Sequence, residues 1–184
     1  MRVIDPRPLT GEPLALDLLN TRWVQDGVRK DLLDGVEGLG VWLAAHGLDA
    51  RFDADGATLE HLLRARDALA GVVDLPGKPG GEAAAVARVD AVLAHGRVRA
   101  ALTPAGPAEE SEFADPSWGP AWLAARDYLT LLADAPDRIR GCAHEACVLH
   151  FFDISRNGTR RWCSMALCGN RAKASRHYAR SREA

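Results

Sequence analysis

The pattern of hydrophobic and polar residues predicts that residues 1–137 are mainly helical. Apolar residues recur in this part at the spacing of a helix that buries one face. An alanine-rich stretch adds a segment of high intrinsic helix propensity. The expected helices cover residues 14–19, 34–46, 82–95 and 118–135, and one more starts at Asp55 or Thr58 and ends near residue 73. Their apolar side chains are numerous enough to build one core of ordinary size.

Polar residues predict where some of these helices begin. Asp34 and Glu37 have the spacing of a capping box, and Asp115 or Ser117 is placed to cap the last helix. The Pro- and Gly-rich stretch at residues 75–82 predicts a break between helices.

One short segment has a different period. Residues 97–103 alternate apolar and polar side chains, which is typical of a β-strand. Residues 104–113 follow either as a loop or as the returning arm of a hairpin. The first part of the chain is therefore expected to be a helical domain with a short β-hairpin.

Charge and cysteine content set the last 47 residues apart. Residues 138–184 hold ten Lys or Arg and three acidic residues, a formal charge of +7, whereas residues 1–137 carry 13 basic and 22 acidic residues, or −9. All four cysteines lie in the basic part. So short and arginine-rich a segment lacks the apolar residues to fold on a core alone. We therefore expect two domains, 1–137 and 138–184, the second held by something other than hydrophobic burial.

Composition excludes some classes of protein. The 184 residues are 47% hydrophobic and 26% charged, which is ordinary for a folded globular chain and unlike a disordered one. No apolar stretch has the 18 or more residues that a membrane-spanning helix needs. The first residues have no apolar run of the kind found in export signals. These observations predict a cytoplasmic protein that is not bound to membranes.

The cysteines form two pairs with equal spacing. Cys142 and Cys147 are separated by four residues, as are Cys163 and Cys168. Four thiolates on two short loops can surround a zinc ion tetrahedrally, and a site closed by four protein ligands is structural rather than catalytic. Zinc binding would then supply the folding energy that this segment lacks.

The cysteines also admit other interpretations. Disulfides fit poorly with a chain that shows no export signal. Unrelated buried cysteines would be scattered among the helices of residues 1–137, which contain none. His144 and His150 are close enough in sequence to be rival ligands. Oxidation of the thiolates with release of zinc is a further alternative role for the site.

The residues around the cysteines predict the local fold. Asn157-Gly158 is a strong hairpin-turn signal, so residues 148–154 and 159–162 are expected to pair around it. Asn170 is placed to cap a helix that runs to about residue 182. Cysteine pairs, hairpin and helix together predict a treble-clef-like zinc module.

The same residues resemble a known family. The run from RIRGCAHEAC through SRNGTRRWCSM to CGNR, over residues 138–180, is similar to the CGNR zinc finger, whose name matches residues 168–171. Residues 14–21 and 31–48 are similar to the ABATE domain that precedes this finger in such proteins. The resemblance implies a stress-associated bacterial transcription regulator, in which the finger binds DNA and the N-terminal domain senses a small molecule.

Basic side chains are the candidates for nucleic-acid contact. On a helix that starts near residue 169, Lys173, Arg176 and Arg180 fall on one side, where they could follow a phosphate backbone. The complete candidate set adds residues that flank the expected turn and one near the metal: Arg156, Arg160, Arg161, Arg171, Lys173, Arg176 and Arg180. Nothing in the sequence distinguishes DNA from RNA.

A second function stays open beside DNA binding. The opposite charges of the two segments also suit a zinc-stabilised protein-interaction module, which would bind an acidic partner or the N-terminal domain. Known catalytic motifs are absent from the sequence, so we do not expect an enzyme. For a small-molecule effector, Asn20, Thr21 and Trp23 are the candidates, because they place polar groups beside an apolar segment.

Overall fold

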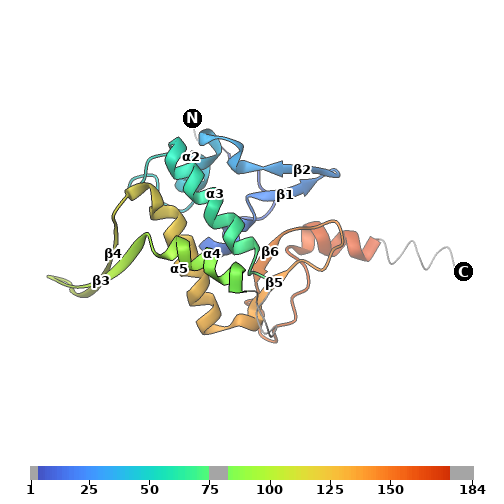
Figure 1. Cartoon of the computed structure of the whole chain (residues 1–184). Coiled ribbons are helices and arrows are strands. Elements are labelled where there is room, and N and C mark those ends of the chain that lie inside the picture. Colours follow the sequence, from blue (N-terminus) through green and yellow to red (C-terminus); the bar gives the residue numbers. More distant parts are fainter. Residues whose placement is uncertain (1–3, 75–82, 175–184) are drawn as a thin grey trace, which may run out of the picture.

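The computed structural model describes residues 4–74 and 83–174. In this part, five α-helices surround one core, a further helix begins at Met165, and three two-stranded antiparallel sheets lie around them (Figure 1). The first five helices are α1 (Leu14–Leu19), α2 (Val36–Ala45), α3 (Gly56–Ala70), α4 (Ala83–Leu93) and α5 (Gly119–Asp134). The mainly helical fold that the sequence predicts is confirmed.

The core forms where α1, α3 and α5 meet. Leu16 and Leu18 of α1 are completely buried, as are Leu62 and Leu69 of α3 and Trp42 of α2. Helix α1 is short, yet it contacts both α3 and α5, so it lies at the centre of the helical part. No helix in the described residues is both long and apolar enough to cross a bilayer.

The strands pair as three hairpins. They are β1 (Arg22–Gln25) with β2 (Val28–Asp31), β3 (Gly96–Thr103) with β4 (Gly106–Phe113), and β5 (Ile139–Gly141) with β6 (His150–Phe152). Short 3₁₀ turns join some elements: η1 (Leu32–Asp34), η2 (Pro116–Trp118) and η3 (Pro136–Arg138).

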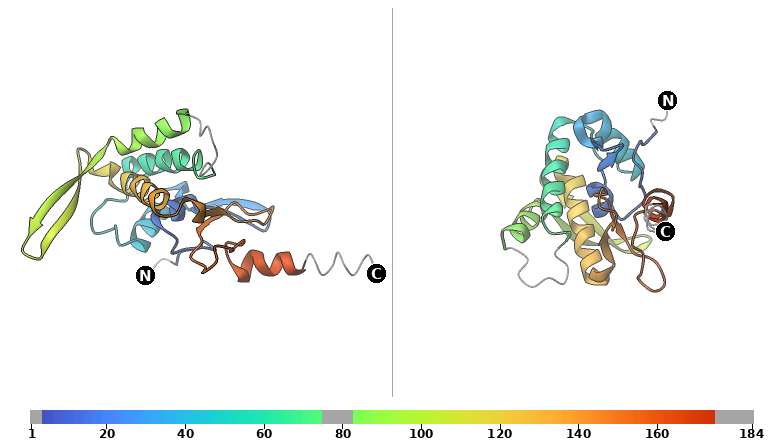
Figure 2. Two further views of the ribbon diagram at one scale, coloured as in Figure 1. Left: turned by 90° about the horizontal axis from the view of Figure 1, so that it is seen from below. Right: turned by 90° about the vertical axis from the view of Figure 1, so that its right-hand side faces the viewer.

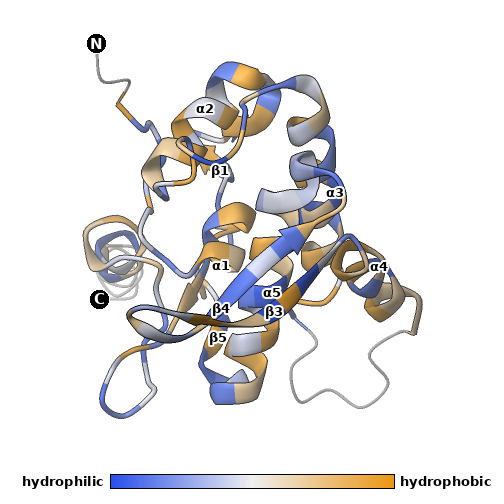
Figure 3. Cartoon of the chain, turned by 90° about the vertical axis from the view of Figure 1, so that its left-hand side faces the viewer, coloured by the Kyte–Doolittle hydropathy of each residue, from blue (hydrophilic) through white to orange (hydrophobic). Residues whose placement is uncertain are grey.

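The hairpin expected at residues 97–113 is longer and more regular than its sequence suggests. Eight residue pairs join β3 and β4, from Gly96↔Phe113 to Thr103↔Gly106. The hairpin projects from the helical body, at the end opposite the C-terminal helix (Figure 2). Hydrophilic residues cover most of β4 (Figure 3), and Arg97 and Arg99 pair with Glu112 across the two strands.

The β1–β2 hairpin was not predicted. Its turn is Asp26-Gly27, and both residues have positive φ, 52° and 76°. A two-residue turn of this kind requires positive φ at both positions, which Asp-Gly adopts readily. The strands lie beside the end of α3, and Asp31 at the end of β2 accepts hydrogen bonds from Arg66 of α3, with Nη1–Oδ1 and Nη2–Oδ2 distances of 2.6 and 2.8 Å.

The helix starts agree only in part with the predicted caps. Helix α2 begins after Gly35 with no side-chain cap, so the predicted capping box of Asp34 and Glu37 is wrong. Asp31 caps η1 instead, accepting from Leu33 N. Asp115 caps η2, which leads directly into α5. The predicted break at residues 75–82 lies outside the described residues.

A buried polar network stabilises the N-terminal segment. Asp17 of α1 is 1% exposed and accepts hydrogen bonds from Trp42 Nε1 at 3.1 Å and from His46 Nε2 at 2.9 Å. It also pairs with Arg7, which is itself bonded to Asp5. Burial alone would raise the pKa of Asp17, but the hydrogen bond from His46 and the Arg7 charge outweigh it, so the pKa lies below its ordinary value.

Candidate metal centre

The first cysteine pair lies in the loop that joins β5 to β6. Strand β5 ends at Gly141 and β6 begins at His150, so Cys142 and Cys147 stand on one connection between paired strands. The loop is closed by two backbone hydrogen bonds, from Cys142 N to Leu149 O at 2.9 Å and from Cys147 N to His144 O at 2.8 Å. The strand pairing therefore fixes the position of both thiols.

The second pair lies at the start of the C-terminal helix. Cys163 comes just before it, and Cys168 lies in its first turn, a wide π-turn over Met165–Gly169. Ser164 caps this turn by accepting from Ala166 N at 3.2 Å. The helix thus begins at Met165, four residues before the predicted start near residue 169, and Asn170 lies inside it with helical φ and ψ rather than capping it.

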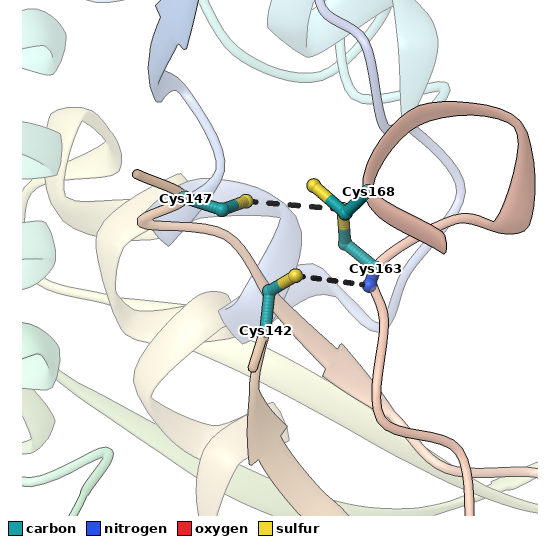
Figure 4. A group of neighbouring side chains, drawn as sticks. All are labelled: Cys142, Cys147, Cys163 and Cys168. Atoms are coloured by element: carbon teal, nitrogen blue, oxygen red, sulfur yellow. Dashed lines mark hydrogen bonds between the residues drawn. The ribbon is translucent and has the colours of Figure 1, made fainter. Parts of the chain in front are cut away.

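The four sulfur atoms converge. All four lie within 4.8 Å of one another. Cys142 and Cys147 approach from one side and Cys163 and Cys168 from the other (Figure 4). The Cys147–Cys163 and Cys163–Cys168 sulfur distances are 3.8 and 3.5 Å. Four sulfurs about 2.3 Å from one zinc ion are about 3.8 Å apart in a tetrahedron, so this donor set fits zinc.

The electrostatics of the cluster also indicate a bound cation. A hydrogen bond from Cys163 lowers the pKa of Cys147 to about 5. Burial raises the pKa of Cys168 to about 12, and the neighbouring Cys147 raises that of Cys163. Four thiols this close, two of them buried, cannot all ionise unaided, because each thiolate repels the next. A divalent cation removes that repulsion.

The two histidines near the cluster are occupied by other groups. His144 Nδ1 accepts from Ala146 N at 3.3 Å. His150 Nε2 lies 3.4 Å from Asp74 Oδ1. The metal-ligating group found among the described residues contains the four cysteines and neither histidine.

The hairpin predicted around Asn157-Gly158 is wrong. A turn does form there, closed from Gly158 N to Ser155 O at 3.1 Å with Gly158 at φ 61°. The following residues do not pair with β6, however, because β5 occupies that place, with Ile139 opposite Phe152.

Side chains hold the turn in place of strand pairing. Asp153, 1% exposed, accepts from Ser155 N and from Arg160 N, each at 2.9 Å. Arg138 donates to the carbonyl oxygens of Asp153 and Ser155. The sequence carries no local motif for this arrangement of Arg138 and Asp153, which is why both residues were missed.

Most of the predicted nucleic-acid residues in the described part are exposed. Arg156, Arg161, Arg171 and Lys173 are exposed, and none forms an ion pair with a residue that the structure describes. Arg176 and Arg180 lie outside the described residues.

Arg160 is placed differently from the other candidates. Its guanidinium lies 4.1 Å from the centre of the Phe151 ring. It donates to the carbonyl oxygens of Trp162 and Cys163 and pairs with Glu12 at 3.3 Å. Arg160 therefore joins the N-terminal domain to the cysteine cluster.

The three predicted effector residues lie in different surroundings. The Asn20 side chain forms two hydrogen bonds with the backbone of His150. Asn20 Nδ2 donates to the carbonyl oxygen of His150, and the backbone N–H of His150 donates to Asn20 Oδ1, both at 2.8 Å. Thr21 Oγ1 donates to Leu18 O and accepts from Arg66 Nη1 at 2.9 Å. Both side chains are completely buried. Trp23 lines a cavity between α3, the β1–β2 hairpin and β6.

Comparison with known proteins assigns both parts of the chain. Residues 12–135 match the ABATE family, described as "Putative stress-induced transcription regulator", and residues 138–181 match the CGNR zinc finger. A search of curated proteins found no match. Both descriptions concern regulators or zinc fingers and neither describes an enzyme. With the four converging sulfurs, the zinc-finger match identifies zinc as the cofactor. The chain therefore belongs to the ABATE family and carries a CGNR zinc finger after its ABATE domain.

Proposed function

We propose that this protein is a cytoplasmic transcription regulator that binds DNA through its zinc module. In this proposal the chain has two domains, 1–137 and 138–184. The second domain is a treble-clef-like module whose zinc ligands are Cys142, Cys147, Cys163 and Cys168. The first domain senses a small molecule.

The observation that carries the proposal is a set of exposed cations on the zinc module that form no ion pair with described residues, although the Arg161 guanidinium lies 5.3 Å from the centre of the Trp162 ring. Arg156 lies in the turn at residues 155–158 and Arg161 follows it, and Arg171 and Lys173 lie on the helix that begins at the metal site. All four side chains are exposed and lack an acidic partner among the described residues. Such cations on a rigid scaffold can neutralise phosphates and release the counterions that a nucleic acid carries.

The metal supplies the rigidity that this role requires. Cys163 and Cys168 bracket the start of the helix, so zinc fixes the helix relative to the β5–β6 loop. A cation that is held in place loses little conformational entropy when it meets a phosphate. The zinc site therefore contributes to binding through position and carries no reaction step.

The test is salt-dependent binding of the zinc-loaded full chain to a fluorescent random-sequence duplex DNA. The variant Arg156→Glu/Arg161→Glu should weaken binding at least ten-fold at low salt. It should also reduce the slope of log affinity against log salt by about 2, because each lost phosphate contact removes about 0.9 from that slope.

The matched control is Arg64→Glu/Arg88→Glu, which makes the same change in net charge on the exposed faces of α3 and α4. It should retain most of the parent affinity. Equal losses in both variants would show that only net charge matters. Unchanged binding in Arg156→Glu/Arg161→Glu, with zinc content intact, would contradict the proposal. A stem-loop RNA titrated in parallel decides between DNA and RNA.

A protein partner is the second candidate. Ile154 is 84% exposed, and Val148 and Met165 are about half exposed, so the zinc module also presents apolar side chains to solvent. Substituting all three by Ser would leave DNA binding unchanged if the first candidate is correct. Loss of DNA binding in that variant would contradict the cationic surface.

A further inference from the structure

A cavity lies where the N-terminal domain meets the zinc module. Its volume is about 370 Å³, within the size range of small-molecule sites. One wall is formed by Trp23 of β1 and by Arg66 and Ala70 of α3, and another by Val148 and His150 next to the first cysteine pair. An occupant would touch both domains.

Two buried nitrogen atoms point to what the cavity takes. Among the described residues, Arg66 Nε and His150 Nδ1 are the buried side-chain polar atoms without a hydrogen-bond partner. Both belong to residues that line this cavity. Buried polar groups are normally satisfied, and each exception needs an explanation.

The neighbouring bonds leave these two nitrogen atoms without a hydrogen-bond partner in the structure. Arg66 is 2% exposed and uses both Nη atoms on Asp31 and Thr21, so only Nε–H remains to donate. The backbone of His150 is fixed by Asn20, and Nε2 faces Asp74, so Nδ1 remains. The Nε–H of the Arg66 guanidinium is a hydrogen-bond donor, so an oxygen atom of an occupant can accept from it.

The charges around the cavity favour an anion. Arg22, Arg29, Lys30 and Arg66 line it with a single acid, Asp31. Asp31 is already paired with Arg22 and Arg66. Arg29 and Lys30 form no ion pair with any residue in the described ranges. The cavity thus keeps an excess of positive charge for a ligand to neutralise.

The remaining walls are apolar. Leu19, Trp23, Ala70 and Val148 contribute hydrocarbon and an aromatic ring. A free inorganic anion would leave these surfaces without a partner, whereas a planar organic group would cover them.

We infer that this cavity binds a small aromatic carboxylate, whose carboxylate is neutralised by Arg29 and Lys30 and accepts a hydrogen bond from Arg66 Nε, and whose ring packs against Trp23. The inference gives the effector of the proposed function a site and a chemical class, and to that extent rests on it. Ligand binding is measured without nucleic acid, so either claim can fail alone.

The test is calorimetric titration of the zinc-loaded full chain with benzoate, phenylacetate and indole-3-acetate. The matched neutral amides and inorganic phosphate serve as comparison probes. At least one carboxylate should bind with a dissociation constant below about 1 mM and shift the indole N–H resonance of Trp23, assigned with Trp23→Phe. The matching amide should bind at least ten-fold more weakly.

Two variants alter the cavity by different routes. Arg29→Glu/Lys30→Glu reverses charge on exposed strand β2, and Ala70→Phe places a ring at an exposed position that lines the cavity. Each should weaken the carboxylate at least ten-fold, whereas Arg64→Glu/Arg88→Glu should change its affinity less than two-fold. Unfolding curves of all three establish that the fold is retained.

Several results would overturn the inference. These are no binding by any of the three carboxylates, equal binding of acid and amide, binding of phosphate alone, or cavity variants that bind as tightly as the parent. Loss of DNA affinity in Arg29→Glu/Lys30→Glu without any carboxylate binding would instead assign these cations to the nucleic-acid surface.

Discussion

The two parts of the chain differ in how many of their basic residues are paired. In the described helical part, seven arginines are paired with acids, namely Arg7, Arg22, Arg64, Arg66, Arg97, Arg99 and Arg126, whereas Arg29, Lys30, Arg51 and Arg88 form no ion pair with described residues. In the described zinc module, Arg140 and Arg160 are paired, whereas Arg156, Arg161, Arg171 and Lys173 form no ion pair. Cations that stabilise a fold are neutralised within it, and cations left free are available to a partner.

The two parts also differ in what stabilises them. The helical part is organised by buried leucines and tryptophans, whereas the zinc module has few such residues, among them Leu149 and Phe151, and relies on four thiols. The comparison predicts different responses to loss of metal, of a buried charge, of a contact between the two parts and of a surface pair.

Removing the metal should have the largest effect. Cys163→Ser should abolish stoichiometric zinc binding, because a structural site of this kind contributes about 10–16 kcal/mol of apparent binding free energy. The zinc module should become sensitive to protease while most of the helical circular dichroism signal remains. Zinc content and limited proteolysis measure both effects.

The control for that variant is His144→Ala, between the first two cysteines, which should keep one zinc per chain. Loss of the entire helical signal in Cys163→Ser would show that the two parts do not fold separately.

Removing the buried carboxylate should come next. Asp17→Asn leaves Arg7 buried without its partner and should lower the free energy of unfolding by about 3–5 kcal/mol. The folded-state pKa of Asp17 is depressed, so its stabilisation is present above the unfolded value near 3.9 and is lost as pH falls through the folded pKa. Urea denaturation should therefore show the parent and the variant converging below about pH 4.

Asp137→Asn, at an exposed position, serves as the comparison and should not converge with the parent in this way. A constant difference between the parent and Asp17→Asn from pH 7 to pH 3 would mean that the network does not stabilise the ionised form.

Breaking the contact between the two parts should cost less. Asn20→Ala leaves the backbone N–H and C=O of His150 without their partners and should lower the free energy of unfolding by about 1–3 kcal/mol. Hydrogen exchange should report faster exchange at His150. Asn20→Asp, which keeps the acceptor but loses the donor, should fall between alanine and the parent; an alanine variant with parental exchange would contradict this role.

The smallest effect is expected at an exposed pair on α3. Glu60→Gln removes the ion pair with Arg64 one helical turn away and should change the free energy of unfolding by about 0.3–0.5 kcal/mol. A shift in the urea midpoint larger than that of Asn20→Ala would reverse the proposed ranking.

The sequence predicts the cluster of four cysteines because the whole signal is local. Two cysteine pairs of equal spacing in a basic segment with little core leave few alternatives to zinc. The β1–β2 hairpin also has a local turn signal, Asp26-Gly27. Its strands are short and show no clear alternation of apolar and polar residues, so the hairpin was not predicted. Asn157-Gly158 shows the opposite case, because a real turn signal does not decide which strand pairs with β6.

The cavity between the two parts could not be predicted. It forms because α3, the β1–β2 hairpin and the segment after Cys147 meet in space, and each contributes only a few residues. Of the predicted effector residues only Trp23 lines it. Asn20 was selected as a polar residue at a helix end, yet its partner lies 130 residues away in the chain.

The connection between the two parts is very short. Helix α5 ends at Asp134, η3 begins at Pro136, and β5 follows at Ile139, so a single residue separates the last long helix from the structure that leads into the first cysteine. So short a linker allows almost no rotation of the zinc module relative to the helical part. In the proposed function, DNA bound to the zinc module would therefore meet the helical part at one fixed angle. The projecting β3–β4 hairpin would then point in one direction relative to the DNA axis.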